Sequence, residues 1–276
     1  MDVKWLIEDY EGDGTLDPLI SEIKYQGMQC EVINYIPFQS GKYNHYINDE
    51  LVIFYGSLNL AAQLQREKPW VPGPICNFKK LCCLTYYSYW GKHLFNKDYI
   101  MLPLLELSRR REEIYKQFGI DDCIFIRPDS GAKTFYGAVY PLDELDGELK
   151  LMGGYAGKPL DEIIVVISSP KIISKEYRIV VIDKKAVAFS QYKNNNKLEI
   201  KEGADTEAIN LANEVASSEW QPDVAYTLDI CKSDGKYYLL EVNSFSCSGF
   251  YDCSPEPIVR EISRVALEEY NSYNDI

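Results

Sequence analysis

Residues 227–243 read TLDICKSDGKYYLLEVN, and this stretch decides the fold. Two apolar runs rich in strand-forming residues flank the turn sequence Ser-Asp-Gly, which predicts an antiparallel β-hairpin. Because side chains two residues apart on a strand point to the same face, Glu241 and Asn243 share one face of the second strand. Leu240 and Val242 occupy the other face. The pattern therefore places two oxygen-bearing side chains together on an otherwise apolar strand.

The register of this hairpin decides whether Asp229 joins the same face. A two-residue loop sends Asp229 to the far face, whereas a three-residue loop with Gly235 in the left-handed conformation brings it beside Glu241. Small or polar residues alternate with bulky apolar ones along residues 225–230. The three-residue loop keeps the bulky residues together on the core side, so we expect this loop. It would cluster Asp229, Glu241 and Asn243.

Such a cluster of two carboxylates and one amide oxygen suits Mg²⁺, which binds one or two carboxylates together with phosphate oxygens and water. Buried carboxylates without partners cost free energy, and a bound cation offsets that cost. The alternative is a solvated outer face that carries incidental charges. The strand pattern alone does not separate the two interpretations.

A second segment, CIFIRPDSGAKTFYG at residues 123–137, brackets a short loop with two cations. Arg127 ends a predicted strand, and Lys133 follows a loop that contains Ser130 and Gly131. Small residues let backbone N–H groups approach phosphate oxygens, while the cations neutralise their charge. The P-loop pattern GxxxxGK[ST] is absent. The segment indicates a polyphosphate site, with a surface salt bridge of Arg127 as the alternative.

A third segment, residues 165–192, reads VVISSPKIISKEYRIVVIDKKAVAFSQY. A buried strand runs into Ser168 and Ser169, and the next strand carries Glu176 and Arg178 on one face. A buried arginine requires an anionic partner. The alternative is an ion pair between Glu176 and Arg178 on an exposed face.

In their order along the chain, FIRP, VVISSP, EYRIVV and TLDICKSDGKYYLLEVN resemble the ATP-grasp superfamily over roughly residues 96–255. YGSLNLA, LFNKDY and AFSQY resemble an uncharacterised phage and bacterial branch of it. The resemblance implies an α/β fold built from α+β lobes. It implies a Rossmann-like pre-ATP-grasp domain at residues 1–90 and an ATP-grasp domain at 91–276. Two lobes of the latter, about 91–166 and 167–276, would sandwich ATP.

The same resemblance assigns roles to individual residues. It implies that Arg178 is catalytic and that Mg²⁺ is bound by Asp229, Glu241 and Asn243. The residues implied to bind the nucleotide are Arg127, Lys133, Ser168, Ser169, Lys171 and Glu176.

Three departures from the family pattern stand out. Arg127 occupies a position where many members have lysine, and the loop after it is poor in glycine. The hinge lacks the acidic residue that often holds the ribose, so Ser169 or Lys171 would replace it. The upstream lysine on the adenine side would be Lys92 or Lys97.

The function implied by the resemblance is an ADP-forming, ATP-dependent carboxylate–amine ligase that works through an acylphosphate. A small-molecule or peptide carboxylate and an amine would be its co-substrates, bound near NSFSCSGFY (residues 243–251) and the N-terminal domain. One alternative is a kinase of the same fold that phosphorylates a small molecule. The other is an ATP-binding regulatory protein without turnover.

Composition restricts the class of protein further. The chain has 276 residues and a formal net charge of −13, which disfavours a broad nucleic-acid-binding surface. No apolar run reaches the ~20 residues that a membrane helix needs, and the acidic N-terminus lacks a signal-peptide pattern. The eight cysteines include no CxxC pair, which favours reduced, buried thiols over a zinc site. We expect a cytoplasmic protein.

Overall fold

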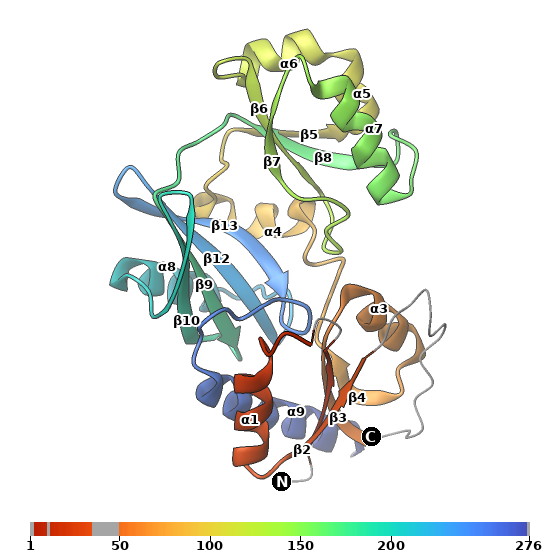
Figure 1. Ribbon diagram of the computed structural model, residues 1–276, viewed down its shortest axis with the longest axis vertical. Helices are drawn as coiled ribbons and strands as arrows, with labels where there is room; N and C mark the ends of the chain where they lie inside the picture. The colour runs from red at the N-terminus through yellow and green to blue at the C-terminus, as the bar shows by residue number, and fades with distance from the viewer. Residues whose placement is uncertain (1–2, 10–11, 35–49, 275–276) are drawn as a thin grey trace.

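The structure is a computed structural model that describes residues 3–9, 12–34 and 50–274, and it contains three β-sheets (Figure 1). The first sheet is parallel, with strand order β2-β1-β3-β4. Ser57 begins α3 as the sequence predicts, because its Oγ accepts the N–H of Leu60 at 3.2 Å. Gly27, with φ +79°, follows the end of α1. The elements of this part are β1 (Lys4–Glu8), α1 (Asp17–Tyr25), β2 (Gln29–Ile33), β3 (Glu50–Tyr55), α3 (Leu58–Glu67) and β4 (Trp70–Pro74).

The second sheet is antiparallel, with strand order β5-β8-β6-β7. Its inward residues, among them Ile126 and Ile167, form a separate core with the helices on one face. The opposite face carries Arg127 toward the third sheet (Figure 1). The elements are β5 (Tyr99–Pro103), α5 (Leu104–Arg109), α6 (Arg111–Phe118), β6 (Cys123–Pro128), β7 (Ala138–Pro141), α7 (Leu145–Ala156) and β8 (Ile164–Ser168).

The third sheet is antiparallel and has the order β11-β10-β9-β12-β13. Alternate residues of its central strands, such as Ile179 and Leu228, pack against α4 and α8, which leaves the other face for polar side chains. The elements are α4 (Cys83–Trp90), the short 3₁₀ helix η1 (Gly91–His93), β9 (Lys175–Ile182), β10 (Lys185–Asn194), β11 (Lys197–Glu202), α8 (Thr206–Ala216), β12 (Ala225–Ser233) and β13 (Lys236–Ser244).

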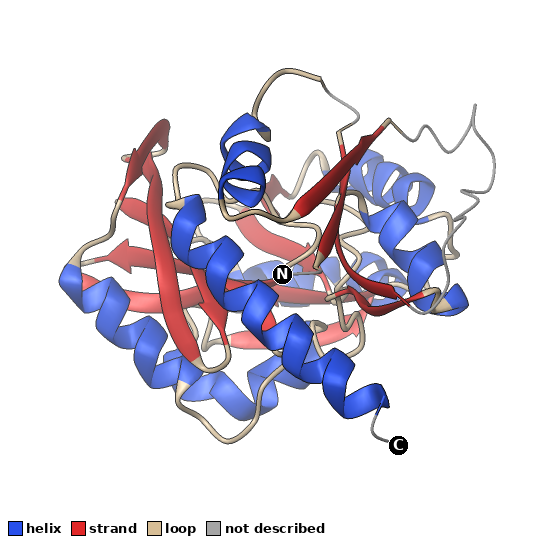
Figure 2. Ribbon diagram, turned by 90° about the horizontal axis from the view of Figure 1, so that it is seen from below, coloured by secondary structure: helices blue, strands red, loops and turns tan. Residues whose placement is uncertain are grey.

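The last helix, α9 (Pro255–Asn274), joins the first sheet to the third. Its apolar face, with Ile258 and Ile262, packs on residues of β1 and β3 and on Val180 and Ala225. Figure 2 shows α9 crossing the molecule before it reaches the C-terminus. Over the described ranges, none of the helices is both long and apolar enough to cross a membrane.

The β12–β13 hairpin confirms the predicted shared face and corrects the predicted loop. Asp229 lies opposite Glu241, but the turn has only two residues, Asp234 and Gly235, with φ +48° and +74°. The three-residue loop is therefore wrong. A β-bulge at Leu240 supplies the extra residue, because Ile230 pairs with Leu239 whereas Asp229 pairs with Glu241.

The predicted cap of α8 also differs. Asp205 occupies the N-cap position, yet its side chain caps no helix N–H. Its carboxylate instead accepts hydrogen bonds from Tyr237 Oη at 2.6 Å, Lys175 Nζ at 3.2 Å and Lys232 Nζ at 3.3 Å. Burial opposes ionisation of Asp205, but these hydrogen bonds outweigh it and lower its pKa. Two nearby ammonium groups thus compete successfully with the helix end.

Candidate active site

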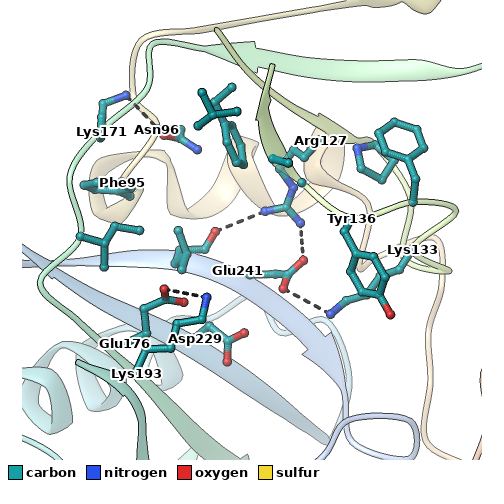
Figure 3. Close-up of a pocket in the computed structure, with 18 of the residues that line it drawn as sticks. Phe95, Asn96, Arg127, Lys133, Tyr136, Lys171, Glu176, Lys193, Asp229 and Glu241 are labelled. Carbon is teal, nitrogen blue, oxygen red and sulfur yellow. Dashed lines mark hydrogen bonds and ion pairs between the residues drawn. The ribbon is translucent and has the colours of Figure 1, made fainter. Parts of the chain in front are cut away.

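A cavity of about 460 Å³ lies between the second and third sheets (Figure 3). Its described lining includes five cations, Arg127, Lys133, Lys171, Arg178 and Lys193, and three carboxylates, Glu176, Asp229 and Glu241. The charged lining is thus net positive, although the whole chain carries a formal charge of −13. Such a local excess of cations attracts a polyanion.

Arg178 and Asp229 form a buried, two-pronged ion pair. They lie opposite each other on β9 and β12, and Nε and Nη2 of Arg178 donate to the two oxygens of Asp229 at 2.6 and 2.9 Å. Burial opposes the charge of Arg178, but Asp229 outweighs it and raises the pKa of the guanidinium. The alternative of an exposed Glu176–Arg178 pair is therefore wrong. Glu176 instead accepts bonds from Tyr192 Oη at 2.5 Å and Lys193 Nζ at 3.1 Å.

Arg127 and Glu241 form a second ion pair, which joins the second sheet to the third. Nη2 of Arg127 lies 2.6 Å from Glu241 Oε1, and Lys133 Nζ lies 3.3 Å from Oε2. Nη1 of Arg127 donates to the carbonyl of Leu240 at 3.3 Å. Burial opposes ionisation of Glu241, but the cations Arg127 and Lys133 outweigh it and lower its pKa. Arg127 is only 8% exposed, so a surface salt bridge does not describe it.

Asn243 completes the oxygen cluster on this face. Its Nδ2 donates to Asp229 Oδ2 at 3.2 Å, while its buried Oδ1 has no hydrogen-bond partner. No group of three or more His, Cys, Asp or Glu side chains comes together in the described part of the chain. A divalent cation here would therefore use the Asn243 amide oxygen beside the carboxylates of Asp229 and Glu241. This hard-oxygen donor set fits Mg²⁺.

The hinge before β9 contributes to the same cavity. Ser169 and Lys171 line it, and Lys171 Nζ donates to Asp98 Oδ1 at 2.7 Å and Asn96 Oδ1 at 3.3 Å. Ser168 lies deeper, fully buried, and its Oγ has no partner. A nucleotide contact by Ser168 stays a prediction.

Neither candidate for the upstream lysine lies among the cavity-lining residues. Lys92 forms an exposed ion pair with Glu214 at 2.9 Å. Lys97 Nζ lies 5.8 Å from the centre of the Tyr238 ring. The cation that the structure places on this side of the cavity is Lys171.

Sequence reasoning missed several cavity residues, chiefly Tyr192 and Lys193 on β10 and Tyr251 after β13. A hairpin pairing of β9 with β10 could have suggested Lys193 as a partner for Glu176. Two register shifts in β10 separate the observed pairing from the one that a regular hairpin gives. Counting back from the turn would therefore have chosen the wrong residue.

Comparison with known proteins gives one family match. A family model described as an ATP-grasp domain, family 3 of its clade, matches residues 104–262. A comparison with curated proteins finds no match.

Several solved structures are similar over nearly the whole chain. One is D-cycloserine synthetase DcsG, with 12% identity, a TM-score of 0.65 and coverage of 96% of this chain and 99% of that one. Another is D-alanine–D-alanine ligase from Bacillus anthracis, with 15% identity, a TM-score of 0.57 and coverage of 100% and 99%. The ATP-grasp ligase PsnB with a minimal precursor has 12% identity, a TM-score of 0.54 and coverage of 96% and 100%. At such identities the likeness concerns the fold.

Proposed function

The chain belongs to this family of ATP-grasp domains, and from this premise we propose that it is an ATP-dependent ligase that joins a carboxylate to an amine. The observation that carries the proposal is the cavity between the two antiparallel sheets. It combines an excess of cations with a cluster of metal-binding oxygens. That pairing suits a polyphosphate bound together with Mg²⁺.

In this proposal each charged side chain has a separate task. Arg127 and Lys133 bind phosphate oxygens, and Ser168, Ser169, Lys171 and Glu176 contact the rest of the nucleotide. Asp229, Glu241 and Asn243 hold Mg²⁺, which neutralises charge on the phosphates. Arg178 stabilises the transferring phosphoryl group, because charge spreads over the oxygens of that group during transfer.

The reaction has two steps. A carboxylate oxygen attacks the γ-phosphorus of ATP, the bond to the bridging oxygen breaks, and ADP leaves. The amine nitrogen then attacks the acyl carbon, the carbon–oxygen bond to phosphate breaks, and the nitrogen loses a proton. Neither step uses a protein nucleophile, so the protein binds, orients and neutralises charge.

We propose a second cavity, of about 180 Å³, as the binding region of the amine. It lies where β1 and β3 end, and its charged lining groups are Glu8, Asp9 and Asp13. Glu8 is 2% exposed and accepts the N–H of Ser57 at 2.7 Å, and no cation of the described residues forms an ion pair with it. Burial raises the pKa of Glu8. A cationic amine would supply the missing counter-charge.

The amine region lies next to the proposed transfer site. Gly249 lines the second cavity, and its carbonyl accepts a hydrogen bond from Nη1 of Arg178 at 2.6 Å. An amine bound near Glu8 would therefore be one loop segment away from the acyl group.

Glu8→Gln tests the amine region. This neutral, isosteric change should raise the KM for the amine by roughly 10- to 150-fold, the scale of a hydrogen bond to a charged group. ADP release in the carboxylate half-reaction, measured with hydroxylamine as the acceptor, should stay at its wild-type rate. Glu31→Gln, on the exposed strand β2, is the matched control. An unchanged amine KM would remove Glu8 from the proposal.

Arg127→Ala tests the phosphate contact. It should weaken binding of Mg·ATP by about 1.5–3 kcal/mol, because it removes charge-assisted hydrogen bonds. Calorimetry on the folded variant measures this directly. Arg111→Ala, which breaks an exposed ion pair with Asp146 in the same lobe, is the control and should bind ATP normally. Wild-type affinity in the Arg127 variant contradicts the assignment.

The reaction class is tested with purified protein, Mg·ATP and a library of carboxylates, with hydroxylamine as a universal amine. A ligase releases ADP and forms a hydroxamate only when its carboxylate is present. Paired amines then give a product whose mass equals both substrates minus one water. A phosphorylated hydroxyl compound without hydroxamate would indicate a kinase. Tight ATP binding without ADP release would indicate a regulatory protein.

A further inference from the structure

The loop between β13 and α9 holds a tyrosine in a conformation that tyrosine rarely adopts. Tyr251 has φ +53°, in the left-handed region where a Cβ atom is crowded. Glycine or asparagine would take this conformation at lower cost. Residues held this way cluster at functional sites, because the surrounding structure must enforce them.

The strained backbone places the Tyr251 ring in the nucleotide cavity. The ring lines the cavity and remains 42% exposed. It stacks on Tyr192, with centroids 4.7 Å apart and planes at 7°. Tyr192 is itself fixed by its hydrogen bond to Glu176. The Tyr251 ring therefore rests on a rigid support.

The ring also covers Arg178. The guanidinium carbon lies 5.0 Å from the centre of the Tyr251 ring and 5.9 Å from that of Tyr192, within range of cation–π attraction. A hydrogen bond from Arg178 Nη1 to Gly249 O ties the guanidinium to the same loop. One loop thus holds the guanidinium through both a ring and a carbonyl.

These contacts restrict Arg178 in different directions. Asp229 and the carbonyl of Gly249 take three of its five N–H groups, which fixes the group within its own plane. Hydrogen bonds in that plane resist tilting only weakly. A ring against the guanidinium limits motion out of the plane. The two remaining N–H groups, one on each terminal nitrogen, then keep a constant direction.

We propose that Tyr251 is a positioning residue, which holds the Arg178 guanidinium in the orientation needed at the transferring phosphoryl group. The inference rests on the proposed function, in which Arg178 acts on that group. It explains why the loop keeps a tyrosine at a position whose backbone favours glycine. The ring, rather than the hydroxyl, performs the role.

Tyr251→Leu keeps apolar bulk but removes the ring. It should lower kcat by about tenfold, as expected when a group in the transition state is misaligned, and leave the KM for ATP unchanged. Tyr251→Phe keeps the ring and should restore most of kcat. Tyr25→Leu, on the exposed face of α1, is the control for loss of a tyrosine ring. Wild-type kcat in Tyr251→Leu, or equal loss in Tyr251→Phe, overturns the proposal.

A double-mutant cycle and a second readout separate this inference from the proposed function. Tyr251→Leu should have no further effect on kcat in an Arg178→Lys background if it acts through the guanidinium. Independently of turnover, NMR of arginine Nε–H groups should show Arg178 Hε exchange about tenfold faster in Tyr251→Leu than in wild type. Unchanged exchange overturns the positioning role even if no substrate pair is found. Absence of carboxylate-dependent ADP release in wild type refutes only the proposed function.

Discussion

Arg178→Ala should lower kcat by roughly 10²–10³, the scale of removing one preorganised charge-stabilising group from an active site. The KM for ATP should change much less, because the contribution arises in the transition state. Arg178→Lys should recover only part of the rate, since an ammonium cannot reproduce the planar fork that Asp229 grips. Steady-state kinetics on the three proteins measures both quantities.

The same substitution should also affect stability. Arg178 and Asp229 are buried, and removing the arginine leaves the carboxylate of Asp229 without its cation. Breaking such a pair costs on the order of 3–5 kcal/mol of unfolding free energy. Denaturant unfolding must therefore accompany the kinetics, and Arg178→Lys keeps the charge if Arg178→Ala does not fold. A stable variant with wild-type kcat would exclude Arg178 from the reaction.

Glu241→Gln should separate binding of metal-bound ATP from binding of free ATP. It removes one carboxylate from the proposed Mg²⁺ site, so turnover should fall by about 10²-fold or more and half-maximal activity should need more Mg²⁺. It also releases Arg127 and Lys133 from their carboxylate partner. ATP in the presence of a chelator should therefore bind at least as tightly as to wild type.

Calorimetry with and without Mg²⁺ checks these opposite expectations. Glu199→Gln, on the exposed strand β11, is the matched control and should leave the Mg²⁺ requirement unchanged. Equal weakening of ATP binding under both conditions would show that Glu241 shapes the cavity without contacting metal.

The sequence predicted the ATP-grasp fold, which the family match confirms, and the strands that carry its polar motifs. These strands could be predicted because each combines period-two alternation with a neighbouring turn. β5 could not, since YIMLP is a continuous apolar run inside a stretch with helical ends. Its partner, β8, begins more than 60 residues later. Only this distant pairing identifies the run as a strand.

The candidate site was predicted in part for a similar reason. Asp229 and Glu241 lie close in sequence, so a hairpin brings them together whatever the rest of the chain does. Arg127 reaches Glu241 from another sheet, and Tyr251 reaches Arg178 from a loop. Those contacts depend on how the sheets are placed relative to one another, which local patterns do not encode.

The bulge at Leu240 has a meaning as an insertion. With the two-residue turn, a hairpin lacking Leu240 would pair regularly and would still set Asp229 opposite Glu241, because the next residue after Leu239 would then be the glutamate. The extra residue is therefore unnecessary for the register of the acidic pair. What it adds lies on the outer strand of the sheet: a carbonyl that accepts from Arg127 and a side chain that walls the cavity. A one-residue insertion of this kind alters what a strand edge offers to a neighbouring lobe and leaves the chemistry on its face in place.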